Sequence, residues 1–186
     1  MSVTRSFFWL IAVLAFAWLA LGVTLYVFQE RAIYLADSQH IAVNPDWPIE
    51  EITIDAPDGE KLVAWHMSAD VGCPTMLVLH GNAGHVGKAA SQYSRIHKAG
   101  LGMLALSWRG YAGSTGRPAP EGLYMDAQAS YEALRAFRVA PQDIIVHGFS
   151  LGASPATKVA AENEVAALIL EAPFYSALRL AQEQIP

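Results

Sequence analysis

Residues 143–152 read DIIVHGFSLG, an apolar run that leads directly into a Gly-x-Ser-x-Gly pentapeptide. Residues 151–163 follow with a helical pattern, so the pentapeptide stands between a predicted strand and a predicted helix. A sharp turn at this point forces its central residue into a crowded backbone conformation, and Gly148 and Gly152 leave room for it. This context predicts that Ser150 is an exposed nucleophile near the positive end of a helix. The structural alternative is a small-residue packing turn with the serine as a plain N-cap.

A second stretch, HGNAG beginning at His80, also follows a short apolar run directly. Acyl transfer builds negative charge on a carbonyl oxygen, so hydrogen-bond donors must already point at that oxygen. We expect one donor to be the backbone amide of Leu151 and the other to be that of Asn82, with Ala83 as the second choice. His80 and Gly81 are predicted to shape the loop and the turn rather than to react.

The rest of the chain predicts a sheet that carries these two turns. Four nearly all-apolar runs are typical of strands buried on both faces, at residues 76–79, 103–106, 144–146 and 165–170. Helical patterns alternate with them, at residues 88–99, 121–138 and 151–163. Ahead of them, residues 51–55 and 61–67 flank a Pro-Asp-Gly turn and predict a hairpin. This order predicts an α/β fold, a mostly parallel sheet with flanking helices.

The composition argues against several classes of function. The 186 residues carry 12 Lys and Arg against 17 Asp and Glu and have no basic block, which argues against nucleic acid as a partner. The single cysteine, Cys73, excludes a disulfide framework and a multi-cysteine metal site. Residues 81–88 resemble a phosphate-binding loop, but Asn82 and Ala89 stand where that motif needs Gly and Ser or Thr. We therefore expect no bound nucleotide, metal or organic cofactor.

A membrane-spanning segment is predicted at the N-terminus. No residue from Ser6 to Gln29 is charged, and residues 7–28 are almost continuously apolar. At about 1.5 Å per residue a helix of this length spans about 33 Å, enough for a hydrocarbon core of about 30 Å. Residues 15–17 (Ala-Phe-Ala) offer a signal-peptide cleavage site, but the apolar run continues well past them. We expect an uncleaved single-pass anchor.

The predicted organisation is an anchor at residues 1–28, a connector at 29–48 and an enzyme-like domain at 49–186. Arg5 is the one base before the apolar run, and the charges directly after the run nearly cancel. This weak bias favours a body on the non-cytoplasmic side of the membrane.

Three stretches taken together resemble a known family: LHGNAG at 79–84, SWRGYAGSTGRPAPEGLYMDAQA at 107–129, and VHGFSLGASPA at 146–156. Their order and spacing resemble the α/β-hydrolases, most of all the bud-emergence-protein-like, membrane-anchored branch of serine hydrolases. The resemblance implies that Ser150 is the nucleophile and that the HGN loop supplies the oxyanion hole.

The resemblance also implies roles for residues of the middle stretch. Arg109, Gly110 and Tyr111 would be scaffold residues beside the pocket, and Asp126 a structural helix residue. Ala112 departs from the pattern, because many members carry glycine there; the departure concerns local loop geometry.

The sequence lacks the rest of a catalytic triad. In α/β-hydrolases the serine is followed by an acid and then by a histidine, but no aspartate and no histidine follows Ser150. His147 precedes the serine on the same strand and is not expected to reach it. Glu171 could be the acid, although a structural role is the favoured interpretation. The resemblance implies two further strands beyond Pro186, so we expect a C-terminally incomplete domain with an exposed apolar edge at 165–170.

The sequence thus predicts a membrane-anchored serine hydrolase of ester, thioester or amide bonds that works through an acyl-enzyme. Its partner would be a small acyl-type substrate, with the membrane bound through residues 7–28. In the form given we expect it to be inactive or nearly so, because the serine lacks its base. The alternatives are a non-catalytic α/β-hydrolase-like binding protein and a gene relic.

Overall fold

The computed structural model describes residues 3–174, so the end of the predicted domain, residues 175–186, lies outside the described part. The chain divides into two compact units, one up to Leu35 and one from Ala36 onward. We describe each unit by itself.

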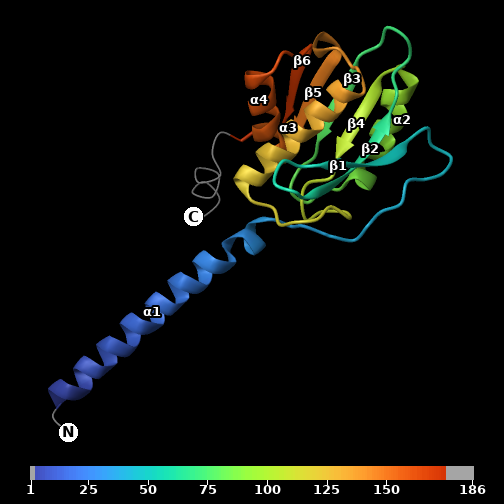
Figure 1. The fold of residues 1–186 in the computed structure, drawn as a ribbon. Helices are drawn as coiled ribbons and strands as arrows, with labels where there is room; N and C mark the ends of the chain where they lie inside the picture. Colours follow the sequence, from blue (N-terminus) through green and yellow to red (C-terminus); the bar gives the residue numbers. More distant parts are fainter. Residues whose placement is uncertain (1–2, 175–186) are drawn as a thin grey trace. The chain divides into compact units, whose positions relative to one another are not determined.

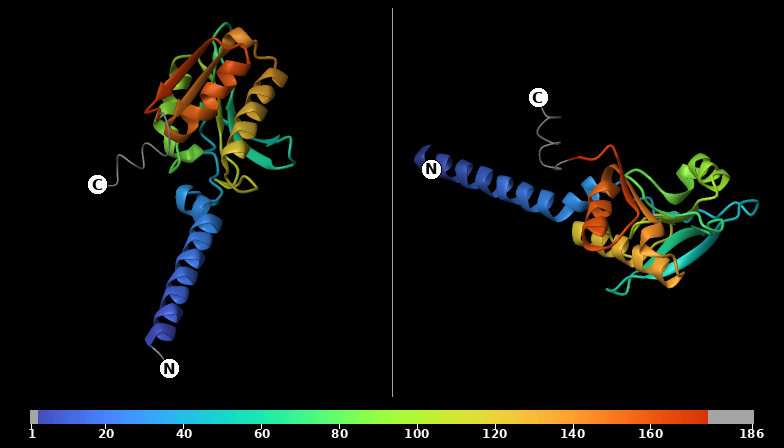
Figure 2. Two further views of the ribbon diagram at one scale, coloured as in Figure 1. Left: turned by 90° about the vertical axis from the view of Figure 1, so that its left-hand side faces the viewer. Right: turned by 90° about the horizontal axis from the view of Figure 1, so that it is seen from above.

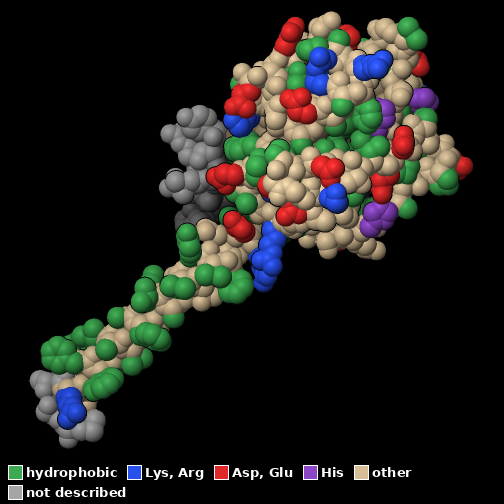
Figure 3. Space-filling view, viewed as in Figure 1, with side chains coloured by type: hydrophobic (Ala, Val, Ile, Leu, Met, Phe, Trp, Pro, Cys, Tyr) green, Lys and Arg blue, Asp and Glu red, His purple; other side chains and the backbone are tan. Residues whose placement is uncertain are grey.

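The first unit is one long helix, α1 (Val3–Ile33). The span Arg5–Ile33 is long and apolar enough to cross a membrane by length and composition, and its side chains are exposed rather than packed against protein (Figure 3). The helix continues beyond residue 28 because the residues that follow, Gln-Glu-Arg-Ala, are all good helix formers.

The second unit is built on a six-stranded sheet in the order β1-β2-β4-β3-β5-β6 (Figure 1). Its strands are β1 (Glu50–Asp55), β2 (Lys61–Met67), β3 (Thr75–Leu79), β4 (Gly102–Leu106), β5 (Ile144–Phe149) and β6 (Ala167–Glu171). Strands β1 and β2 form the predicted antiparallel hairpin, and β2 also runs antiparallel to β4. The pairs β3–β4, β3–β5 and β5–β6 are parallel. The carboxyl ends of these four strands therefore lie at the same edge of the sheet.

Helices cover both faces of this sheet. They are α2 (Ala90–Lys98), α3 (Pro120–Ala136) and α4 (Ala153–Glu162). Figure 2 shows α2 on one face and α3 and α4 on the other. The α/β fold class predicted from the sequence, with a mostly parallel sheet and flanking helices, is therefore confirmed.

The central strands hold the core. Every residue of β4 is buried, and Leu77 and Leu79 of β3 are fully buried beside it. Each such leucine contributes roughly 2 kcal/mol by leaving water. The carboxyl ends of β3 and β5 are thus fixed by the best-packed part of the sheet, and both predicted reactive turns follow those ends.

Strand β6, unlike the central strands, is exposed along its whole length. It pairs with β5 at the end of the described sheet, and all five of its residues are exposed. Leu168, Ile169 and Leu170 are between 37% and 45% exposed, unusual values for consecutive apolar strand residues. The exposed apolar edge expected from the sequence is therefore present at β6.

Candidate active site

The Gly-x-Ser-x-Gly stretch forms a tight turn between β5 and α4. Strand β5 ends at Phe149, a short 3₁₀ turn covers Ser150–Gly152, and α4 begins at Ala153. Ser150 has a φ of +49°, in the left-handed region that costs a residue with a side chain roughly 1–2 kcal/mol. Ser150 is half-buried rather than exposed as predicted, and strain of this kind at a strand-to-helix turn is typical of a nucleophile elbow.

Two glycines make this turn possible. A Cβ on Gly152 would lie 2.1 Å from the carbonyl oxygen of Leu79, a backbone atom that cannot move aside. A Cβ on Gly148 would lie 2.6 Å from the Cβ of Ala156. The turn therefore packs directly against the end of β3 and the first turns of α4, and any side chain at either position would displace it.

The loop after β3 lies against the same serine. A Cβ on Gly81 would meet the Phe149 ring at 2.7 Å and the Cβ of Ser150 at 3.3 Å. The loop closes as a turn in which the Gly84 amide donates to the Gly81 carbonyl at 3.0 Å. The structure thus brings together two predicted site segments that are almost seventy residues apart in the sequence.

His80 faces the loop and its supporting turn. Its Nδ1 lies 2.8 Å from the Gly81 carbonyl oxygen, and its ring meets the rings of Trp108 and Tyr111 edge-on. The indole nitrogen of Trp108 donates to the His80 carbonyl at 2.9 Å. These contacts are those of a residue that holds the loop in shape.

Asn82, the predicted oxyanion donor, is also held by a residue of the segment after β4. The hydroxyl of Tyr111 donates to Asn82 Oδ1 at 2.9 Å, and Tyr111 is fully buried. The family resemblance implied for Tyr111 only a scaffold role beside the pocket. Its bond to Asn82 has no signal in the sequence, because the two residues meet only when β3 and β4 pair.

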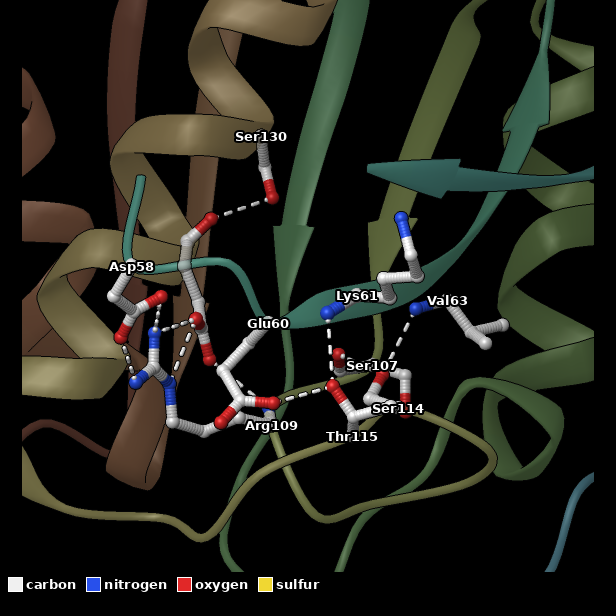
Figure 4. A network of polar contacts seen from close by, with 10 residues as sticks. Asp58, Glu60, Lys61, Val63, Ser107, Arg109, Ser114, Thr115 and Ser130 are labelled. Carbon is white, nitrogen blue, oxygen red and sulfur yellow. Dashed lines mark hydrogen bonds and ion pairs between the residues drawn. The ribbon is translucent and has the colours of Figure 1, made fainter. Parts of the chain in front are cut away.

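Arg109, which lies between Trp108 and Tyr111 in the sequence, takes part in a buried ion-pair network (Figure 4). The Arg109 backbone amide donates to Asp126 Oδ2 at 2.9 Å, and its Nε and Nη2 donate to Oδ1 at 2.9 and 2.7 Å. Arg109 Nη1 also donates to Asp58 Oδ2 at 2.7 Å. The network ties the end of β4 to α3 and to the β1–β2 hairpin turn.

The charges in this network are strongly coupled. Burial opposes the charge of Arg109, but hydrogen bonds to Asp126 and Asp58 outweigh it and raise the guanidinium pKa above its ordinary value. The hydrogen bond from Arg109 holds the pKa of Asp58 below its ordinary value. Arg109 therefore stays charged, and no pattern in the sequence indicated Asp58 as its partner.

A cavity of about 340 Å³ opens beside the loop, lined among others by His80, Gly81, His147 and Glu171. His147 Nε2 and Glu171 Oε2 are 3.4 Å apart and so pair with each other. Within residues 3–174, no hydrogen bond joins a histidine to the Ser150 hydroxyl, and no cluster of three or more His, Cys, Asp or Glu side chains is placed to hold a metal ion.

Comparison with known sequences finds relatives along most of the chain. A mycobacterial protein, Rv2307c of Mycobacterium tuberculosis, is 35% identical over 168 residues, which is 86% of this chain and 59% of that protein. Human alpha/beta hydrolase domain-containing protein 17C is 33% identical over 164 residues, 78% of this chain and 48% of that protein. The chain thus spans about half to three-fifths of the length of these curated relatives.

Solved structures show the same fold. An alpha-beta hydrolase from Vibrio vulnificus superposes with a TM-score of 0.71 at 24% identity, over 87% of this chain and 62% of that one. The esterase Pf2001 of Pyrococcus furiosus gives a TM-score of 0.62 at 22% identity, over 74% of this chain and 58% of that one.

A family model described as Serine aminopeptidase, S33 (Hydrolase_4) matches residues 73–184, which include both turns of the site and the buried arginine. The family match covers more than half of the chain and agrees with the fold and with the relatives. The chain therefore belongs to this serine aminopeptidase family of α/β-hydrolases.

Proposed function

We propose that this chain carries the nucleophile and the oxyanion hole of a membrane-anchored serine hydrolase of the bud-emergence-protein-like type. The proposal rests on the strained backbone of Ser150, which has a φ of +49°. The HGN loop that follows β3 packs against this residue. The substrate would be a small acyl-type compound, an ester, thioester or amide. The helix α1 would anchor the enzyme, with its body on the non-cytoplasmic side.

The chemistry would be acyl transfer in two steps. Ser150 Oγ attacks the carbonyl carbon while its proton passes to the base. The carbonyl electron pair moves onto oxygen, where the amides of Leu151 and Asn82 stabilise the charge. The tetrahedral intermediate collapses and expels the leaving group, which takes up a proton from the base. Water then attacks the acyl-enzyme in the same way, which releases the carboxylic acid product and restores the Ser150 hydroxyl.

The base and its orienting acid are the parts that this sequence does not supply. No aspartate and no histidine follows Ser150, and an unactivated serine hydroxyl is a weak nucleophile. We propose that the 186-residue chain alone turns over little or no substrate.

A non-catalytic binding protein is the second candidate. It is favoured by one observation: among residues 3–174 the histidine nearest in sequence to the serine, His147, pairs with Glu171 and not with the serine hydroxyl. A strained serine and a tightly packed glycine loop have no use in such a protein, so the hydrolase proposal is preferred. A gene relic would likewise have no reason to keep them.

Chemical rescue tests the proposal directly. The purified full chain in detergent is treated with a fluorophosphonate, with and without added imidazole, which can act as the missing base. We expect labelling at Ser150, accelerated by imidazole and abolished in Ser150→Ala. Ser154→Ala, one turn further along α4, is the matched control and should label as the wild type does.

Two results would contradict the proposal in different ways. Labelling that is unaffected by Ser150→Ala, or that imidazole fails to accelerate, argues against an acyl-enzyme at Ser150. Steady ester turnover by the chain without imidazole, abolished by Ser150→Ala, would keep the nucleophile and overturn the proposed inactivity.

A further inference from the structure

We propose that Tyr111 is a positioning residue. Through the side chain of Asn82 it fixes the position of the loop after β3, residues 80–84, which we call the oxyanion loop. This inference rests on the hydrolase proposed above and deepens it, because it assigns the oxyanion hole a support outside its own loop. The juxtaposition is direct: the buried Tyr111 hydroxyl donates to Asn82 Oδ1 at 2.9 Å.

The loop is held at two points by one short turn, residues 108–111. Trp108 Nε1 donates to the His80 carbonyl, which leads into the loop, and the Tyr111 hydroxyl donates to Asn82 in its middle. The Tyr111 ring also meets the His80 ring edge-on, with centroids 5.5 Å apart. The loop therefore takes its position from this turn as well as from its own backbone.

The turn that provides these donors is itself rigid. The Tyr111 amide donates to the Trp108 carbonyl at 2.9 Å, and the Tyr111 carbonyl accepts from Ser107 Oγ and from the Ser114 amide. Between the two donors lies Arg109, whose guanidinium is fixed by Asp126. The turn therefore holds the Tyr111 ring, and with it the hydroxyl oxygen, in one place beside Asn82 Oδ1.

Preorganisation is what an oxyanion donor needs. Donors stabilise a developing charge most when they already point at it and do not reorganise during the reaction. With Asn82 Oδ1 held by Tyr111, the backbone of Asn82 has little freedom to turn its amide away from the carbonyl oxygen of the substrate. Loss of the tyrosine hydroxyl would remove one of the bonds that hold the loop and would leave the Gly84–Gly81 bond less well supported.

The first test measures hydrogen exchange of the Gly84 amide, by NMR on the full chain in nanodiscs. This amide closes the loop turn, so its exchange reports how often the loop opens. Tyr111→Phe keeps the buried ring and removes only the donor. We expect exchange at Gly84 to become roughly three- to tenfold faster, the effect of losing one intramolecular hydrogen bond.

Tyr131→Phe is the matched control. Tyr131 is also buried, and its hydroxyl donates to the Glu164 carbonyl at 3.0 Å, away from the loop. We expect this variant to leave exchange at Gly84 unchanged. If Tyr111→Phe fails to fold, Asn82→Ala provides the same test, because it removes the acceptor and leaves the tyrosine. Wild-type exchange at Gly84 in the variant that folds would overturn the proposal.

The second test is a double-mutant cycle on imidazole-assisted fluorophosphonate labelling. Tyr111→Phe and Asn82→Ala should each slow labelling, and the double variant should be no slower than the slower single variant. Additive losses would mean that the Tyr111 hydroxyl acts independently of the Asn82 side chain and would overturn the proposal. If the wild type does not label at all, the hydrolase proposal fails, while the exchange test at Gly84 still decides the role of Tyr111.

Discussion

Ser150 occupies a backbone conformation that its own side chain disfavours. Its φ of +49° lies where glycine is comfortable, yet the position holds a residue with a Cβ and a hydroxyl. Natural proteins keep such strain where a side chain must stand at a defined point. The conformation is therefore a second sign of function, independent of the hydroxyl chemistry.

This strain has a measurable consequence for stability. Ser150→Gly should relieve the left-handed strain, partly offset by the greater freedom of glycine in the unfolded chain. We expect it to exceed Ser150→Ala in free energy of unfolding by about 0.5–1 kcal/mol, measured by denaturant titration. Ser150→Ala loses the same hydroxyl and keeps the Cβ, so it isolates the backbone effect. A less stable glycine variant would contradict the assigned strain.

At the level of elements, the buried Arg109 joins the end of β4 to α3 and to the hairpin turn. Its two acidic partners differ in burial: Asp126 is fully buried, whereas the Asp58 side chain is one-third exposed. Asp126→Ala would leave a buried guanidinium without its main partner, and we expect a loss of roughly 3–5 kcal/mol in unfolding free energy. Asp58→Asn should cost clearly less. Equal losses would show that the assignment of the main partner is wrong.

The hairpin contact also predicts a pH dependence. The pKa of Asp58 is lowered in the folded protein by Arg109, so its contribution is full above the unfolded value of 3.8 and is lost as the pH falls through the lower folded value. The difference in stability between the wild type and Asp58→Asn should therefore be constant near neutral pH and shrink below about pH 4. A difference that grows on acidification would contradict the sign of the shift.

The sequence predicted the elements more fully than the contacts between them. The apolar runs at 76–79 and 103–106 became β3 and β4, each beginning one residue earlier, because runs buried on both faces leave few alternatives. The sharp turn at Ser150 was predictable because it is a local feature of spacing. The bond from Tyr111 to Asn82 and the partner role of Asp58 were not, since they depend on which strands pair.

For the whole molecule, sidedness is open to a simple measurement, because the chain has one cysteine. Cys73 lies in the second unit and is partly exposed. If the body lies on the non-cytoplasmic side, a membrane-impermeant maleimide should label Cys73 in intact cells whose outer barrier admits the reagent. Cys73→Ser is the control for specificity. Labelling only after lysis would place the body in the cytoplasm.

The central claim is that Ser150 is the nucleophile of an acyl-enzyme, and one measurement tests it most directly. Native membranes are treated with a fluorophosphonate, and the labelled bands of the wild type and of Ser150→Ala are compared. Our account predicts a band that is labelled in the wild type and absent from Ser150→Ala. The absence of any Ser150-dependent band would contradict the claim itself.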